Sequence, residues 1–203
     1  MVSDPDTKII VHCAGRTRSL IGTQSLLNFG MPNKVWALRN GTIGWTLARQ
    51  PLQLGQARRY GDNAGLNDTE TQSKARRLAD RAGVKRASPR DVAAWSKQVD
   101  RTTYCFDVRA PAEYERGHVL GYRSIAGGQL VQELEMYAPV RGARIVLADS
   151  DGVRANMTAS WLAQMAWDVF AVDGYAAADF SETGPEKPPP MPAVMNTMCA
   201  PCS

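Results

Sequence analysis

The sequence has few cysteines, few aromatic residues and no long apolar run, and each shortage excludes a class of protein. Four cysteines in 203 residues are too few and too scattered for a disulfide scaffold. No apolar stretch approaches the roughly 20 residues of a membrane-spanning helix. The polar, acidic residues 1–6 are not followed by the apolar core of a secretory signal. We therefore expect a cytoplasmic protein with no membrane partner.

The charge is also modest, with 24 basic and 20 acidic residues giving a net charge of +4. Much of the excess lies within residues 74–86, which hold six lysines and arginines. No aromatic residues are interleaved with these cations, so the stacking surface of a single-strand binder is missing. We interpret the segment as a solvated helix face and expect no nucleic-acid partner. Apolar residues make up 44% of the chain, enough for a globular core.

The chain contains a repeated half-domain. Residues 9–18 align without a gap on residues 145–154, and after a small deletion residues 35–38 align on 169–172. Each copy consists of an apolar strand, a polar loop, an amphipathic helix, a second apolar strand and a glycine turn. This order indicates a right-handed crossover in a parallel α/β sheet. The short runs of Ile, Val and Leu predict first strands that are buried on both faces.

The segments ahead of the two copies differ. The second copy follows about sixty residues that predict a helix capped by Ser88 and Pro89, a strand over Thr103–Asp107 and a helix over residues 129–137. Only eight residues precede the first copy. We expect the first domain to be completed by a missing upstream segment or by a partner chain, because half of such a sheet should not be stable alone. The predicted division is a C-terminal half-domain (1–60), a linker helix (61–86), a complete domain (87–180) and a disordered, proline-rich tail (181–203).

Cys13 is the candidate catalytic residue. It ends the first strand and opens a loop, residues 14–18, that enters a helix at Ser19. Free backbone N–H groups at the helix start, the helix dipole and two arginines all favour a thiolate and can bind an anion. The alternative is a buried structural cysteine at a strand end. Cys105 lies in an apolar run and is interpreted as an ordinary buried thiol.

Two further features carry no predicted chemistry. His12 lies on the opposite side of the strand from Cys13 and is interpreted as structural. Cys199 and Cys202 form a lone C-x-x-C pair in the tail, which is half a zinc site at best. We therefore predict no metal.

Two groups of motifs resemble rhodanese domains. Residues 11–19 (VHCAGRTRS) and 36–45 (WALRNGTIGW) resemble the active-site half, whereas Asp107-Val108-Arg109, Glu113-Tyr114, Gly117-His118-Val119 and residues 127–130 resemble the entry half. The resemblance implies a doubly wound, parallel α/β fold and a sulfurtransferase without a cofactor.

The resemblance also implies a mechanism and a set of site residues. Cys13 would take sulfane sulfur from thiosulfate or a related anionic donor as a persulfide, and cyanide or a thiol would then accept it. The anionic donor would be bound by Arg18 and Arg16 with the loop residues Ala14, Gly15 and Thr17.

The second copy departs from this pattern. Asp149 stands where the first copy has Cys13, Asp151 makes the loop acidic, and Arg154 aligns with Arg18. A carboxylate cannot become a persulfide, so we expect the complete domain to be catalytically inactive. Arg109 and Glu113, four residues apart, are predicted to form an ion pair.

Two alternative functions remain open. A cysteine phosphatase or arsenate reductase would use a similar loop, but it has five residues between cysteine and arginine, where this loop has four. A non-catalytic binding or regulatory module would use both copies as docking surfaces.

Overall fold

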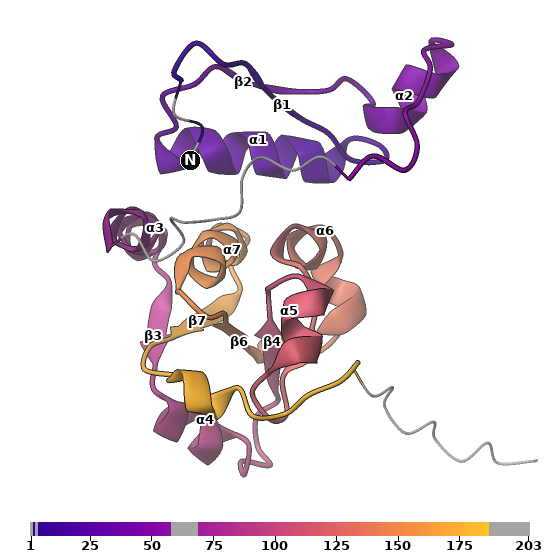
Figure 1. The fold of residues 1–203 in the computed structure, drawn as a ribbon. Coiled ribbons are helices and arrows are strands. Elements are labelled where there is room, and N and C mark those ends of the chain that lie inside the picture. Colours follow the sequence, from indigo (N-terminus) through magenta and orange to yellow (C-terminus); the bar gives the residue numbers. More distant parts are fainter. Residues whose placement is uncertain (1, 3, 58–68, 187–203) are drawn as a thin grey trace, which may run out of the picture.

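The computed structural model describes residues 2, 4–57 and 69–186. Within these residues the chain forms two all-parallel sheets (Figure 1). A two-stranded sheet with order β1-β2 lies in the first unit, residues 4–57, and a five-stranded sheet with order β3-β7-β6-β4-β5 lies in the second unit, residues 69–186. No helix in the described part of the chain is long and apolar enough to cross a membrane.

The first unit contains β1 (Ile9–Val11), α1 (Thr17–Phe29), β2 (Val35–Ala37) and α2 (Gly41–Leu47). Gly30 ends α1 in the left-handed conformation, as its position in the sequence predicts. Helix α1 covers only one face of the sheet. On the other face Ile10 and Trp36 are 61% and 43% exposed, so the prediction that β1 is buried on both faces is wrong. Since α1 supplies the only helical layer described over this sheet, its other face stays open.

The second unit has helices on both faces of its sheet. Its elements are α3 (Thr69–Arg81), β3 (Lys85–Ala87), α4 (Pro89–Trp95), β4 (Thr103–Asp107), α5 (Pro111–Arg116), β5 (Arg123–Ser124), α6 (Gly127–Tyr137), β6 (Arg144–Ala148), α7 (Val153–Gln164), β7 (Asp168–Val172) and a 3₁₀ turn (Ala177–Asp179). Helices α3, α6 and α7 pack with Ile145 and Leu147 on one face, and α4 packs with Val146 on the other. The strand at 103–107 and the Ser88 cap, a full capping box, are confirmed.

The strand registers confirm the internal repeat. Ile9 pairs with Val35 in the first unit, and Ile145 pairs with Val169 in the second. These pairs are the ones that the sequence alignment places over each other. In the second unit, β6 also pairs with β4, and β7 also pairs with β3. The two-stranded sheet therefore corresponds to the middle of the five-stranded one.

The segment predicted as a linker helix ends earlier and belongs to the second unit. Helix α3 ends at Arg81, Gly83 takes a φ of +83°, and β3 then joins the sheet beside β7. The helix stops because the left-handed glycine turns the chain, and the buried Val84 then leads the chain toward the sheet. Residues 58–68 lie outside the described part.

The cations of this segment are largely compensated by neighbouring carboxylates. Lys74 pairs with Glu70, Arg76 with Asp173, Lys85 with Asp168 and Arg86 with Asp80. This pattern is that of a solvated, ion-paired surface.

The prediction that disorder begins at residue 181 is wrong for residues 181–186. Glu182 exchanges two backbone hydrogen bonds with His118, of 2.8 and 3.1 Å. The Glu186 carboxylate accepts hydrogen bonds from the Arg123 guanidinium (2.9 Å) and the Ser124 amide (3.1 Å). Residues 181–186 therefore pack on the second unit. The rest of the predicted tail, with Cys199 and Cys202, lies outside the described residues.

Candidate active site

The Cys13 loop rests on the start of helix α2. The Thr42 and Ile43 amides donate to the carbonyls of Cys13 (3.0 Å) and Ala14 (2.9 Å). The first residue of α2, Gly41, faces the loop and has a φ of +58°. A Cβ at this glycine would lie 2.2 Å from the Cys13 carbonyl oxygen and 2.4 Å from that of Gly15. The loop can approach α2 this closely only because residue 41 has no side chain.

The sulfur of Cys13 lies among hydrogen-bond donors at the start of α1. Partial burial alone would raise the pKa of this thiol. The amide and hydroxyl of Ser19, the amide of Gly15 and the charge of Arg18 outweigh that effect, and they hold the pKa below its usual value. The thiol is only half-buried, so a small reagent can reach it. The site therefore has the two properties of a reactive cysteine, a stabilised thiolate and access.

Sequence reasoning did not select Ser19 as a site residue. Ser19 is 1% exposed, and its hydroxyl lies 2.8 Å from the Arg16 carbonyl oxygen, so that oxygen and the Cys13 sulfur are alternative acceptors for its single proton. The signal was its position, because the third residue of a helix offers a free N–H to a group preceding the helix. Gly41 was noticed only as a turn glycine of the repeat.

The two predicted arginines lie in different surroundings. Arg18 Nη1 donates to Gln129 Oε1 of α6 at 2.8 Å. Arg16 lines a cavity of about 340 Å³, together with Ser19 and, from the loop after β2, Arg39 and Asn40. The structure thus brings Arg16 together with Arg39, a cation that sequence reasoning did not select.

The other predicted loop residues contribute through the backbone. The amide of Gly15 helps to lower the pKa of Cys13, and the Ala14 carbonyl accepts from the Ile43 amide. Thr17 is exposed and begins α1. His12 is also exposed.

In the second unit a carboxylate occupies the place of the thiol. Asp149 Oδ1 accepts from the Gly152 amide at 2.6 Å, and Oδ2 accepts from the Ala155 amide at 2.8 Å. Ala155 aligns with Ser19, so the carboxylate takes the donor that Cys13 uses in the first unit. Burial raises the pKa of Asp149 to about 6, the two amide bonds oppose this effect, and the charge of Asp151 adds to it. The donors of this loop are thus already satisfied.

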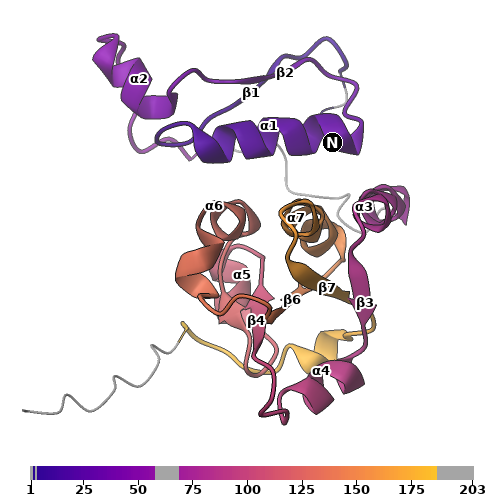
Figure 2. The same cartoon turned by 180° about the vertical axis from the view of Figure 1, so that it is seen from behind.

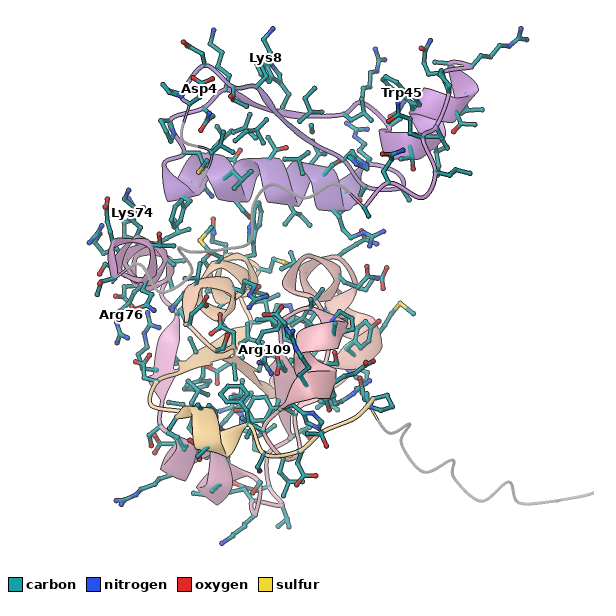
Figure 3. All side chains as sticks on the ribbon, in the orientation of Figure 1. Asp4, Lys8, Trp45, Lys74, Arg76 and Arg109 are labelled. Carbon is teal, nitrogen blue, oxygen red and sulfur yellow. The ribbon has the colours of Figure 1, made fainter. Side chains whose placement is uncertain are left out.

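The predicted ion pair between Arg109 and Glu113 is wrong. Arg109 pairs with the buried Asp107 at 2.6 Å, whose carboxylate also accepts from the Arg109 amide. Glu113 accepts two hydrogen bonds from Arg154, of 2.6 and 2.9 Å. Since the Arg109 guanidinium is also bound by the Gly117 carbonyl and lies over the Phe180 ring, it is fixed inside the second unit (Figure 3).

Two expectations concern other thiols and metals. Cys105 is half-buried as a residue and packs against the core on the α4 side of the sheet; desolvation of its thiol raises the pKa to about 12, as expected for an unreactive structural thiol. Among the described residues no group of three or more His, Cys, Asp or Glu side chains could hold a metal ion.

Residues 88–176 match the family model of the rhodanese-like domain. A solved structure, the thiosulfate sulfurtransferase of Pseudomonas aeruginosa, is 60% identical over 93% of this chain, with a TM-score of 0.86. The second unit is a rhodanese-like domain. The resemblance inferred from the motifs is thus confirmed. The chain spans 36% of the length of that relative.

Other solved rhodanese proteins are more distant. The 3-mercaptopyruvate sulfotransferase of Escherichia coli is 20% identical over 86% of this chain and 68% of its own, with a TM-score of 0.37. A rhodanese-related protein of Thermoplasma volcanium is 18% identical over 47% of this chain and 89% of its own, with a TM-score of 0.39. None of the curated proteins compared with the chain matches it.

Proposed function

We propose that the chain is a thiosulfate sulfurtransferase in which Cys13 carries the sulfur. The observation that carries this proposal is the set of donors around the Cys13 sulfur, which stabilise an anion at the end of a strand. The 60% identity to a thiosulfate sulfurtransferase supports the choice of donor. Arg16 and Arg39, beside the neighbouring cavity, supply positive charge for a dianionic donor.

The reaction has two steps. The Cys13 thiolate attacks the sulfane sulfur of thiosulfate, so that a new S–S bond forms while the S–S bond of the donor breaks and its electron pair leaves with sulfite. The product is a persulfide anion, which the amides of Ser19 and Gly15 can stabilise in place of the thiolate. Cyanide then attacks the outer sulfur and leaves as thiocyanate, which restores the Cys13 thiolate.

Intact mass measurement tests this chemistry. Thiosulfate should add one sulfur atom to the chain, cyanide should remove it, and Cys13→Ser should prevent its addition. Cys105→Ser is the matched control and should load like the wild type, because its buried thiol stays protonated. Failure of the wild-type chain to gain sulfur, or equal gain in Cys13→Ser, would reject the proposal.

We also propose that residues 1–60 are the C-terminal half of a rhodanese domain whose other half packs against the open sheet. The second unit supplies the template. There Val146 and Phe170, the counterparts of Ile10 and Trp36, are covered by α4, and Phe170 contacts Trp95 with ring centroids 4.7 Å apart. The missing half would bring a strand to each edge of β1–β2 and a helix over Ile10 and Trp36. It would come from an upstream segment or a partner chain.

Amide hydrogen exchange tests this division. In the chain alone, the amides of β1 and β2 should exchange much faster than those of β6 and β7, although the strand registers are the same. Equal protection in both sheets would mean that the first unit is complete as it stands.

A non-catalytic role is proposed for the 87–180 domain. Asp149 fills the amide donors of its loop, and Arg154 is neutralised by Glu113. No sulfur should be added to this domain under the conditions that load Cys13. The domain would then have a structural or regulatory role, which it would exert through its contact with the first unit.

A further inference from the structure

Helix α1 contacts the second unit through one face. Arg18, Ile21, Gly22 and Ser25, spaced three and four residues apart, line a cavity of about 390 Å³ together with residues of α6 and α7. Figures 1 and 2 both show α1 lying across these two helices. Two hydrogen bonds join the units. Arg18 Nη1 donates to Gln129 Oε1 at 2.8 Å, and Trp161 Nε1 donates to Ser25 Oγ at 2.8 Å.

The aligned arginines of the two copies, Arg18 and Arg154, have different partners. In the second unit Arg154 is held by both oxygens of Glu113, so its charge is largely neutralised. Its counterpart Arg18 is held by a neutral amide, and no described carboxylate forms an ion pair with it. An amide fixes a guanidinium without cancelling its charge.

The amide itself is held in place. Gln129 Nε2 donates to Glu133 Oε2 on the next turn of α6, which leaves the amide oxygen directed at Arg18. Glu133 Oε1 accepts from Gln132 Nε2 at 2.7 Å. The orientation of Gln129 is thus set by its own helix.

We propose that Gln129 is a positioning residue for Cys13, because it fixes the guanidinium of Arg18, five residues after Cys13, and does so without an ion pair that would cancel the positive charge. This inference rests on the proposed function in so far as a poised thiolate is needed for sulfur transfer. It gives the inactive unit a task, which is to complete the electrostatic surroundings of the active cysteine. The charge of Arg18 is among the causes that favour the Cys13 thiolate.

Other charged groups lie around Cys13 and Arg18, and they are the same in the wild type and in a variant of Gln129. Arg16 on the loop and Arg39 after β2 line the neighbouring cavity, and His12 precedes Cys13. Across the contact lie Glu133 and two ion pairs, Arg154–Glu113 and Arg109–Asp107.

The pH dependence of Cys13 alkylation by iodoacetamide tests the inference. The full chain is alkylated and digested, and the extent of alkylation is measured on the peptide that contains Cys13. The alkylation midpoint is the pH at which the rate is half-maximal.

Gln129→Glu keeps the size of the side chain and its acceptor toward Arg18. It loses the donor to Glu133 and brings carboxylate charge to the guanidinium, so the charge of Arg18 is cancelled. The alkylation midpoint should rise by about half a pH unit, and alkylation below the midpoint should be about threefold slower. Gln24→Glu is the matched control. It adds the same charge six residues from Arg18 on α1, where Gln24 is exposed and donates to Asn28, and it should leave the midpoint within about 0.1 unit of wild type.

A double-mutant cycle shows whether the effect passes through Arg18. In an Arg18→Gln background, Gln129→Glu should no longer shift the midpoint. The inference is overturned by an unchanged midpoint in Gln129→Glu, by an equal shift in Gln24→Glu, or by a shift that persists without Arg18. Should Gln129→Glu fail to fold, Gln129→Met replaces it. Its midpoint should also rise, because Arg18 is released, and an unchanged value counts against the inference. Alkylation does not require sulfur transfer, so absence of thiosulfate loading would reject the proposed function alone.

Discussion

Gly41 lies where the Cys13 loop meets helix α2, and an alanine at this position should separate the two. The backbone there is left-handed, with a φ of +58°, which costs an L-residue about 1–2 kcal/mol. The added Cβ would also lie 2.2 Å from the Cys13 carbonyl and 2.4 Å from the Gly15 carbonyl. Both contacts are to backbone atoms, so the loop itself has to move, by about 1 Å, to reach van der Waals distance.

Movement of the loop should disturb the donors at the sulfur. The Gly15 amide would leave the Cys13 sulfur, so the alkylation midpoint of Cys13 should rise toward that of an ordinary thiol. A misplacement of about 1 Å at a reacting group costs about a hundredfold in rate, and we expect a similar loss in persulfide formation from thiosulfate. Stopped-flow measurement of sulfite release, with alkylation across a pH series, gives both quantities.

Gly30 provides the matched control. It also has a left-handed backbone, with a φ of +83°, but a Cβ there would meet nothing within 4 Å. Gly30→Ala should therefore lower the stability of the first unit by about 1–2 kcal/mol and leave the rate and midpoint at Cys13 unchanged. A wild-type rate and midpoint in Gly41→Ala would refute the reasoning, and so would equal losses in both variants.

Three further outcomes can be measured. Arg154 lowers the pKa of Glu113 to about 2, so the native carboxylate binds protons less readily than the unfolded one, and stability should fall as the pH drops from about 4.5 to about 2. The share of Glu113 in this loss should be about 1–2 kcal/mol after allowance for partial exposure, measured by urea unfolding as the difference between the wild type and Glu113→Gln across this range. Ser19→Ala removes one donor but keeps its amide, so the Cys13 alkylation midpoint should rise while the fold, judged by circular dichroism, is kept; a lower midpoint contradicts the assignment. Leu147 is fully buried at the sheet centre, and Leu147→Ala should cost about 3 kcal/mol in urea unfolding, with a value below about 1 kcal/mol arguing against this core.

Several parts of the structure could be predicted because they depend on local sequence. The repeat predicted the strand registers, since each copy carries the same strand, loop and helix in the same spacing. Cys13 could be predicted as a poised thiol because a strand end followed closely by a helix start offers donors whatever surrounds it. Ser88 and Pro89 were read correctly for the same reason, because a helix cap is made by residues three apart.

Errors arose where the partner of a residue is distant in the sequence. Glu113 is bound by Arg154 of α7, 41 residues further along the chain, so the pair predicted with Arg109 does not form. Arg109 pairs instead with Asp107, two residues away at the strand end. Residues 85–87 continue a charged segment, and only pairing with β7 makes them a strand.

The sequence by itself determined the parallel α/β class, the two copies and the loop that presents Cys13, because these follow from apolar periodicity and from hydrogen bonds between near neighbours. The tertiary structure alone decided which groups surround that loop. The close approach of α2 at Gly41 and the neutral partner of Arg18 come from segments tens to more than a hundred residues apart. Such contacts are set by how helices pack across a sheet and between units, and no local pattern in the chain encodes them.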